Sequence, residues 1–478
     1  MIKKNIISLL FFSITPFCYS QIDRSIIPKP GPPPSIEIGD PVEFELENGL
    51  KVLLVENNKL PRVTASLILD NKPYPGDEKN GTYSMTSALL GKETKNLKKG
   101  KLTQKIDFLG ASFSVGAGGA FVSSLSKYFE KVLGIMADAI LNPKFRQKEF
   151  EKEKNKIIEI INSNSKNVTQ IARRAERVLS FGKNHPSGKY VTKETLNNVN
   201  LDDVKEFYSQ NLIPNNAYLI IIGDFQSEEV KKLVINLFKN WKKKTQPNRN
   251  WNSPPNSTKL KIHFVDVPNA IQSEIVFQNK VSLKMGDPDY FPVIIANKIL
   301  GGGPEDRLEK QLREVKGYTY SARSSVGTSK YMQTRFRAFT STRFQVTDSA
   351  VIELLKEIKK IREIPVKDDE LKNVKIKYAG NFVLNSESPS TIANYALNIK
   401  TQGLNKDFYK SYLTNINRVT KSDILRVAKK YFNINQGQIV ISGKGTELID
   451  KLKNVKFEGK TIPFESYDQF GNKLEISN

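Results

Sequence analysis

The sequence predicts an α+β protein made of two related halves of roughly 200 residues each. One observation is an internal repeat: VNLDDVKEFYSQNLIPNNAYLIIIGD, from Val199, returns without a gap as VTKSDILRVAKKYFNINQGQIVISGK, from Val419. A second is the polar, Pro- and Asn-rich stretch 243–258, KKTQPNRNWNSPPNST, which lies between the two copies. The third is length, because 478 residues exceed what one core of ordinary size accommodates.

Each copy of the repeat has the pattern of a capped helix followed by a buried strand. Asn200 and Thr420 are suitable N-cap residues for the two helices. A turn and a β-branched strand follow, ending at Gly223 in one copy and Gly443 in the other. The shared register favours duplication over a chance likeness of two helix–strand units.

The first 20 residues have the pattern of a signal peptide. Lys3 and Lys4 precede an apolar run that ends at Phe17, and Ser20 is a suitable residue before a cleavage point. The run is too short to span a bilayer. Lipoprotein processing at Cys18 is the weaker alternative, because Phe17 is bulky where a small residue is needed. We therefore expect export to a periplasm, a Gram-negative-type cell envelope or the medium, with no cysteine left for a disulfide.

The remaining chain divides into five segments. A Pro-rich arm covers 21–40, and an N-terminal domain covers 41–243. In this domain we expect a strand pair around the Glu47-Asn48-Gly49 turn, a strand in VTASLILD, a helix from Gly81 and a charged helix over 146–163. The linker 244–258, a C-terminal domain over 259–460 and a tail over 461–478 complete the chain.

Composition leaves few functional classes open. Lys and Arg number 74 against 50 Asp and Glu, a net charge of +24, but the basic residues are interleaved with acidic ones along the whole chain. No arginine block, zinc-finger spacing or RNA-binding strand motif is present, so we expect no nucleic-acid partner. No later stretch has the length and apolarity of a transmembrane segment.

The usual catalytic residues are scarce. His185, flanked by Pro and Gly, is expected in a surface loop, and His263 in an alternating strand. Neither has a second histidine at ligand spacing, so a His/Cys/carboxylate zinc site is not predicted on this chain. A serine-hydrolase GxSxG motif is absent. The cluster Gly301-Gly302-Gly303 lacks a following GK[ST], which favours a flexible joint or turn over a phosphate loop.

Several ordered motifs resemble the insulinase/pitrilysin family, the M16 peptidases. They are NGLKVLLVENNKLPRVTASLIL, FGKNHPSGKYVTKETLNNVNLDDVKEFYSQNL, ANKILGGGPEDRLEKQLREVKGYTYSARSSVG and the two repeat units. The likeness covers residues 40–450. It is greatest to the bacterial branch with half-size subunits related to mitochondrial processing peptidase. It implies two α/β-sandwich halves, each with a mainly antiparallel sheet covered by helices.

The resemblance also implies that a zinc site has been lost. Active members carry H-x-x-E-H on a helix, where two histidines on one face bind zinc and the glutamate activates water. In GTYSMTSALLGKET these three positions hold Ser84, Ser87 and Ala88. The third-ligand position falls at Ile160, with Glu159 adjacent, and Glu153 supplies a supporting carboxylate. We expect no metal and no catalytic residue on this chain.

The second half resembles the substrate-binding motif L-R-E-x-x-G-x-x-Y of zinc-less partner subunits. Arg313 and Tyr320 match its Arg/Tyr pair, which would bind substrate carbonyls near the scissile bond. Gly301, Gly302 and Gly303 match a family loop near the substrate chamber, although the following Pro304 and Glu305 depart from its usual small residues. Two plainer interpretations stay open: an i,i+4 ion pair of Arg313 with Glu309, and an ordinary strand aromatic at Tyr320.

Together these features predict a non-catalytic subunit of an exported heteromeric M16 peptidase. It would pair with an HxxEH-bearing chain that holds the zinc, and would bind unfolded peptides by β-augmentation. Basic walls would favour acidic or mixed peptides. The alternatives are a non-enzymatic scaffold with the same fold and, more remotely, an anion- or nucleic-acid-binding protein.

Overall fold

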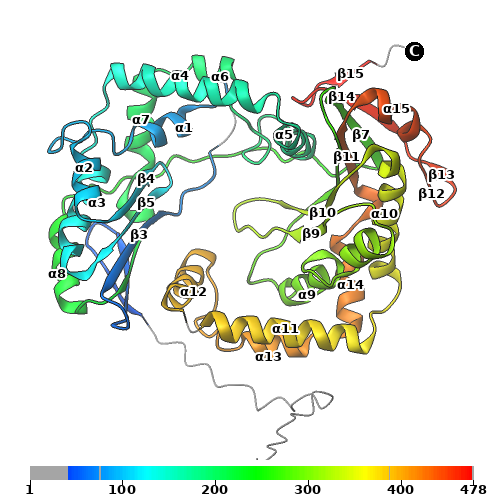
Figure 1. Ribbon diagram of the computed structural model, residues 1–478. Coiled ribbons are helices and arrows are strands. Elements are labelled where there is room, and N and C mark those ends of the chain that lie inside the picture. The colour runs from blue at the N-terminus through cyan, green and yellow to red at the C-terminus, as the bar shows by residue number, and fades with distance from the viewer. Residues whose placement is uncertain (1–40, 75–76, 387, 476–478) are drawn as a thin grey trace, which may run out of the picture. The chain divides into compact units, whose positions relative to one another are not determined.

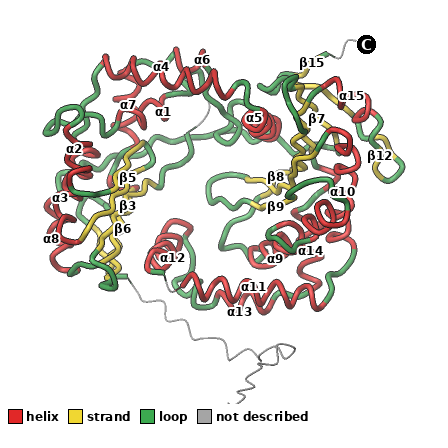
Figure 2. Tube along the Cα trace, viewed as in Figure 1, coloured by secondary structure: helices red, strands yellow, loops and turns green. Residues whose placement is uncertain are grey.

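The computed structural model describes residues 41–74, 77–386 and 388–475, which belong to one compact unit. The expected signal peptide, Cys18 and the Pro-rich arm 21–40 lie outside the described residues. Two large mixed sheets form the framework, each covered by helices (Figures 1 and 2). This confirms the predicted α+β class with two sandwich-like halves.

The N-terminal sheet has six strands and one parallel pair. Only β2 and β6 run parallel; every other neighbouring pair is antiparallel. The turn at Asn48-Gly49 joins β1 and β2 as expected. In spatial order the strands are β1 (Val42–Glu45), β2 (Lys51–Glu56), β6 (Ala217–Gly223), β3 (Arg62–Leu69), β5 (Gly119–Leu125) and β4 (Ser112–Gly116).

The C-terminal sheet repeats this order with additional strands at one edge. In spatial order they are β15 (Lys473–Leu474), β14 (Phe464–Tyr467), β7 (Lys261–Asp266), β11 (Gln438–Gly443), β8 (Ser273–Val281), β10 (Thr334–Thr342) and β9 (Ala322–Val326). The strand β14 pairs in parallel with β7. Part of the expected tail 461–478 thus forms a strand of this sheet. The small ribbon β12 (Lys456–Phe457) and β13 (Lys460–Thr461) precedes it.

The two copies of the repeat occupy equivalent places. Each begins with a helix that has a capping box, Asn200 with Asp203 at α7 (Leu201–Asn211) and Thr420 with Asp423 at α14 (Lys421–Tyr431). The strands that follow, β6 and β11, each lie between a parallel and an antiparallel neighbour. The repeat inferred from sequence is thus a structural repeat.

Helices bury one face of each sheet. In the N-terminal half the main core involves α2 (Lys101–Phe108), α3 (Phe129–Leu141) and α8 (Ser227–Phe238). In the C-terminal half it involves α9 (Tyr290–Gly301), α10 (Thr347–Glu363), α14 and α15 (Gly445–Lys453). The other helices are α1 (Thr82–Leu89), α4 (Gln147–Asn164), α6 (Lys193–Asn197), α11 (Asp368–Ser386) and α13 (Tyr412–Arg418).

The opposite faces are covered by an exchange of helices between the halves. Helix α5 (Val168–Phe181), from the first half of the sequence, packs against β8 and β11 of the second sheet. Helix α12 (Pro389–Gln402), from the second half, packs against β2 and β6 of the first (Figure 1). The halves are therefore interlocked.

The segment between the halves has no helix or strand and is mostly exposed, but two cations tie it to the domains. The Arg249 guanidinium is buried and donates to the Lys72 carbonyl at 2.9 Å. The Lys280 ammonium, in β8, donates to the carbonyls of Pro254 and Pro255. Within the described residues, no helix combines the length and apolarity needed to cross a membrane.

Candidate functional site

Helix α1, where the sequence suggests a lost zinc site, is held by its inward face. Met85 and Leu89 are buried with Phe150 of α4 and with residues near α6 and α7. Ser84, Ser87 and Ala88 are partly exposed. The helix therefore packs without needing ligands on its other side.

Two of the three positions that align with H-x-x-E-H have an identifiable environment: Ser87, at the glutamate position, and Ser84, at a histidine position. The Ser87 hydroxyl accepts a hydrogen bond from the Ala117 amide at 3.0 Å, which ties α1 to the turn between β4 and β5. Ser84 lines a pocket of about 400 Å³. Within the part of the chain that the structure describes, no three His, Cys, Asp or Glu side chains gather closely enough to hold a metal ion.

Of the carboxylates expected on α4, Glu153 has a structural role as the acceptor of two ion pairs. Glu153 is buried and pairs with Lys156 at 2.8 Å and Lys92 at 3.4 Å. Burial opposes its ionisation, but these two ammonium groups hold the pKa of Glu153 below its ordinary value. Ile160 is 57 % exposed and Glu159 is exposed. The carboxylate that remains is thus neutralised by lysines.

The two histidines are both buried. His185 lies in a loop as expected, but the prediction of a surface position is wrong, since only 1 % of the residue is exposed. It stacks on Phe181 at a centroid distance of 4.9 Å and faces the edge of Trp251, so aromatic neighbours bury it. His263 lies in β7 as expected and stacks on Tyr467, and burial lowers its pKa to about 4.

The glycine cluster begins the turn that follows α9, one of the two expected possibilities, and it is tightly packed. Gly301 ends α9, and a Cβ there would lie 2.4 Å from the Ser324 amide nitrogen of β9. The Gly302 carbonyl accepts from Lys298 Nζ at 2.6 Å, and the Gly303 amide donates to Asp306 at 2.8 Å. Close helix–strand packing at Gly301 explains the small residue there.

Arg313 lies on a short π-helix, Glu309–Val315, whose first residue is buried. The Glu309 carboxylate, 1 % exposed, accepts from Arg313 at 2.7 Å and from the Ala322 amide at 3.1 Å, and lies 3.4 Å from Arg323. Burial disfavours ionisation, yet these donors hold the pKa of Glu309 below its ordinary value. The plain ion pair exists, and the Arg313 side chain is still 55 % exposed.

Tyr320 is 94 % exposed in the loop before β9, so it is not a strand aromatic. The loop itself is held at several points. Gly317 has a φ of +61°, its carbonyl accepts from Arg343 at 3.1 Å, and the Tyr318 amide donates to the Leu312 carbonyl at 2.8 Å. Arg313 and Tyr320 therefore belong to one anchored segment next to the edge strand β9.

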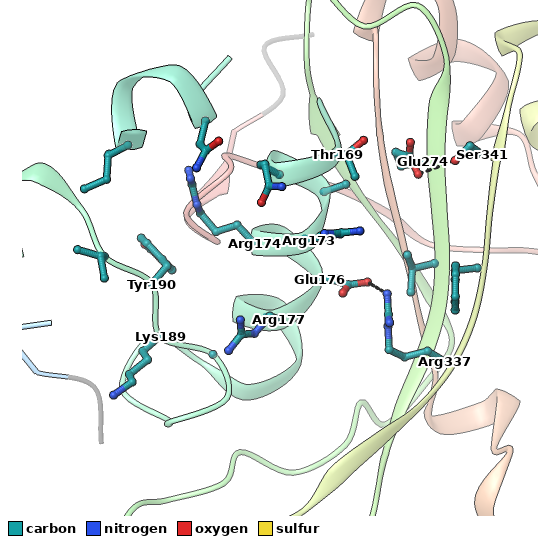
Figure 3. A pocket seen from close by; sticks show the side chains of 18 of the residues that line it. Thr169, Arg173, Arg174, Glu176, Arg177, Lys189, Tyr190, Glu274, Arg337 and Ser341 are labelled. Carbon is teal, nitrogen blue, oxygen red and sulfur yellow. Dashed lines mark hydrogen bonds and ion pairs between the residues drawn. The ribbon is translucent and has the colours of Figure 1, made fainter. Parts of the chain in front are cut away.

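Sequence reasoning missed a cavity of about 950 Å³ between α5 and the strands β8 and β10 (Figure 3). Arg337 of β10 crosses to Glu176 of α5 at 2.7 Å, and Ser341 donates to Glu274 of β8 at 2.7 Å. The alternation in β10, TRFRAFTST, could have signalled an open polar face. That α5 covers this face depends on the helix exchange, which the sequence did not indicate.

Comparison with known proteins gives two matching family models. Residues 54–187 match the insulinase family model, Peptidase family M16, and residues 198–378 match the peptidase M16 inactive domain. Together they cover more than half of the chain.

Relatives are distant but span most of the chain. An "Uncharacterized zinc protease" of Rickettsia bellii is 24 % identical over 413 residues, 83 % of this chain and 96 % of that protein. The "Non-peptidase homolog YmxG" of Helicobacter pylori is 21 % identical over 316 residues, 65 % of this chain and 71 % of its own length.

Solved structures share the fold. A protease from Helicobacter pylori superposes with a TM-score of 0.77 at 20 % identity, over 84 % of this chain and 99 % of the other. The periplasmic protease PqqL from Escherichia coli gives a TM-score of 0.68 at 14 % identity, over 86 % of this chain and 48 % of the other. Both likenesses confirm the expected fold.

Proposed function

The chain belongs to peptidase family M16, and from this premise we propose that it is the substrate-binding, zinc-free subunit of an exported heteromeric M16 peptidase. Its partner would be an HxxEH-bearing M16 chain that holds the zinc. The observation that carries the proposal is a contrast between two segments. Ser84, Ser87 and Ala88 offer no set of zinc ligands, whereas Arg313 and Tyr320 keep exposed donors on an anchored segment.

The proposed role of the pair follows from its chemistry. A guanidinium and a phenol both donate hydrogen bonds, and a donor fixed near a scissile carbonyl stabilises the oxyanion that develops there. The Arg313 guanidinium donates from Nη1 to Glu309, which reduces the conformational freedom that binding would otherwise remove. The edge strand β9, which follows Tyr320, offers unpaired backbone groups to an extended peptide.

Export and partnership rest on separate support. The N-terminal pattern of Lys3, Lys4 and an apolar run is that of a secretory signal. A solved relative of the same fold is described as a periplasmic protease, and another relative as a non-peptidase homologue. A zinc-free chain contributes to proteolysis only if a second chain supplies the metal.

The test is reconstitution with an HxxEH-bearing M16 chain from the same organism, with cleavage of a quenched peptide as the readout. We expect cleavage by the mixture, and a loss of about 100-fold in kcat/KM for Arg313→Ala, the usual effect of removing one such donor. Lys316→Ala is the matched control, because this exposed cation lies on the same segment. Equal losses in the two variants would contradict the proposed role of Arg313.

The alternative is a scaffold that keeps the fold without contributing to proteolysis. The Glu309–Arg313 ion pair favours it, since that pair alone gives Arg313 a structural purpose. The same experiment separates the two. If a partner copurifies and cleaves peptides at the same rate with Arg313→Ala as with the unaltered chain, the chain is a scaffold.

A further inference from the structure

The pocket beside Ser84 has an unusual charge distribution. It holds about 400 Å³ between the start of α1, the segment around Tyr74, and the loop that follows α5. None of the described residues that line it is Asp or Glu. Its four basic lining residues are Lys72, Arg177, Lys189 and Arg249.

The two arginines of this pocket are held by uncharged acceptors. Arg249, 9 % exposed, donates to the Lys72 carbonyl at 2.9 Å and to the Asn211 side-chain oxygen. Arg177 donates from Nε to the Ser187 carbonyl at 2.7 Å. Neither arginine has an ion pair with a carboxylate of the described chain. Water solvates the exposed Arg177, whereas the buried guanidinium of Arg249 faces the Lys72 carbonyl, the Asn211 oxygen and the Tyr74 ring.

The larger cavity next to it provides the contrast. The pockets share Arg177, Lys189 and Tyr190, but in the larger one Glu176 neutralises Arg337 at 2.7 Å. Figure 3 shows this division: Glu176 lies on the side of α5 toward Arg337, and Arg177 on the side of Lys189 and Tyr190. The larger cavity is lined by five basic and two acidic residues, whereas the Ser84 pocket has four basic residues and no acidic one among its described lining.

Helix α1 adds a second attraction for an anion. Its N-terminal residues Gly81 to Ser84 line the same pocket, and no side chain caps the helix at Gly81. The Gly81 and Thr82 amides donate to the Lys79 carbonyl, so the Tyr83 and Ser84 amides are the ones left at this positive end of the helix dipole. Burial lowers the pKa of Lys189 to about 8; Asp77 opposes this shift, and Arg249 and Arg177 add to it.

We infer that this pocket binds a carboxylate of the peptide substrate, held by Arg177, Arg249 and the first turn of α1. The inference rests on the proposed peptide-binding function. Apolar lining from Leu69, Phe207 and Met332 would receive the neighbouring side chain. Arg177 and Arg249 would thus position one end of a peptide beside the start of α1.

Three labelled decapeptides test the inference by fluorescence anisotropy with the isolated full chain. One has a free C-terminal carboxylate and no acidic side chain, the second is its C-terminal amide, and the third is that amide with a glutamate as its last residue. We expect the amide to bind at least about tenfold more weakly than the free acid, since it loses charge-assisted hydrogen bonds. Tight binding of the third peptide would assign the site to a side-chain carboxylate, and weak binding to the C-terminus.

Arg177→Gln should remove most of the difference between acid and amide. The matched control is Arg173→Gln: Arg173 is an exposed arginine of α5 that lines the larger cavity only. It should leave all three affinities unchanged. Equal binding of all three peptides, or equal effects of the two variants, would overturn the carboxylate pocket and leave the proposed function intact. Absence of binding by every peptide would overturn the proposed function as well.

Discussion

Two buried glutamates, one in each half, show how differently the two candidate regions are built. Glu153 supports α1 and pairs with lysines that lie at the surface, Lys92 and Lys156. Glu309 supports the loop of Tyr320 and pairs with Arg313, the residue proposed to bind substrate. In the first region the buried charge only joins α4 to the turn that follows α1. In the second region the buried carboxylate of Glu309 orients the exposed guanidinium of Arg313. Burying a charge costs free energy unless well-oriented partners compensate for its desolvation.

The comparison is tested most directly by Glu309→Ala, for which we expect the largest change in the free energy of unfolding. Removing a buried carboxylate deprives Arg313, Arg323 and the Ala322 amide of their common acceptor. Loss of one partner of a buried ion pair typically lowers the free energy of unfolding by about 3–5 kcal/mol. Urea denaturation followed by circular dichroism measures the change.

The control is Glu314→Ala, an exposed carboxylate five positions along the same segment, which should stay within about 0.5 kcal/mol. The pH dependence has a definite sign. Because the pKa of folded Glu309 is below its ordinary value, its stabilisation is present above that ordinary value and is lost as the pH falls. A loss below 1 kcal/mol for Glu309→Ala would mean that the segment is anchored elsewhere.

The next largest change in stability is expected at Gly301. The family resemblance implies that this glycine lies near bound substrate, whereas its packing against β9 implies a structural role. Gly301→Ala would place a methyl group 2.4 Å from the Ser324 nitrogen, so α9 or β9 must shift. We expect a loss of about 1–3 kcal/mol in the free energy of unfolding, as for other overpacked sites.

Gly303→Ala is its matched control. A Cβ at Gly303 meets only the mobile end of Lys298, whose ammonium can move aside, so the expected loss is within about 0.5 kcal/mol. If both variants are equally stable while peptide binding falls, the glycines act on substrate and the packing argument fails.

Much of the fold could be predicted from sequence because its signals are local. The capping residues Asn200 and Thr420, the alternation around Asn48-Gly49 and the charged helix α4 each depend on neighbours within a few residues. The exchange of α5 and α12 depends on contacts between distant segments, so no local pattern showed it. For the same reason His185 was misplaced at the surface, although Phe181 lies only four residues away and Trp251 closes the site from the segment between the halves.

Of the candidate site, the missing ligands and the Arg313/Tyr320 motif could be identified from sequence, and their surroundings could not. Glu309 was considered only as a surface partner at i,i+4 spacing. The strand β9 lies against its carboxylate, and the Ala322 amide of that strand donates a hydrogen bond to it. The acid-free pocket brings together Arg177 of α5 and Arg249 of the segment between the halves, and only the folded chain shows that no carboxylate is among its described lining residues.

The smallest expected effect tests whether the Ser87 hydroxyl of α1 contributes to the stability of the fold. Ser87→Ala removes the acceptor for the Ala117 amide, and Ala117 is 2 % exposed, so the amide loses its partner. We expect a loss of about 1 kcal/mol in the free energy of unfolding. Ser84→Ala makes the same chemical change one turn earlier, at a hydroxyl that has no such bond, and should have almost no effect. A difference between the two variants would show that Ser87 stabilises the β4–β5 turn. Replacing Ser87 by glutamate would then lower the free energy of unfolding without by itself creating a metal site. Equal stability of the two variants would instead leave α1 free to accept a ligand set again.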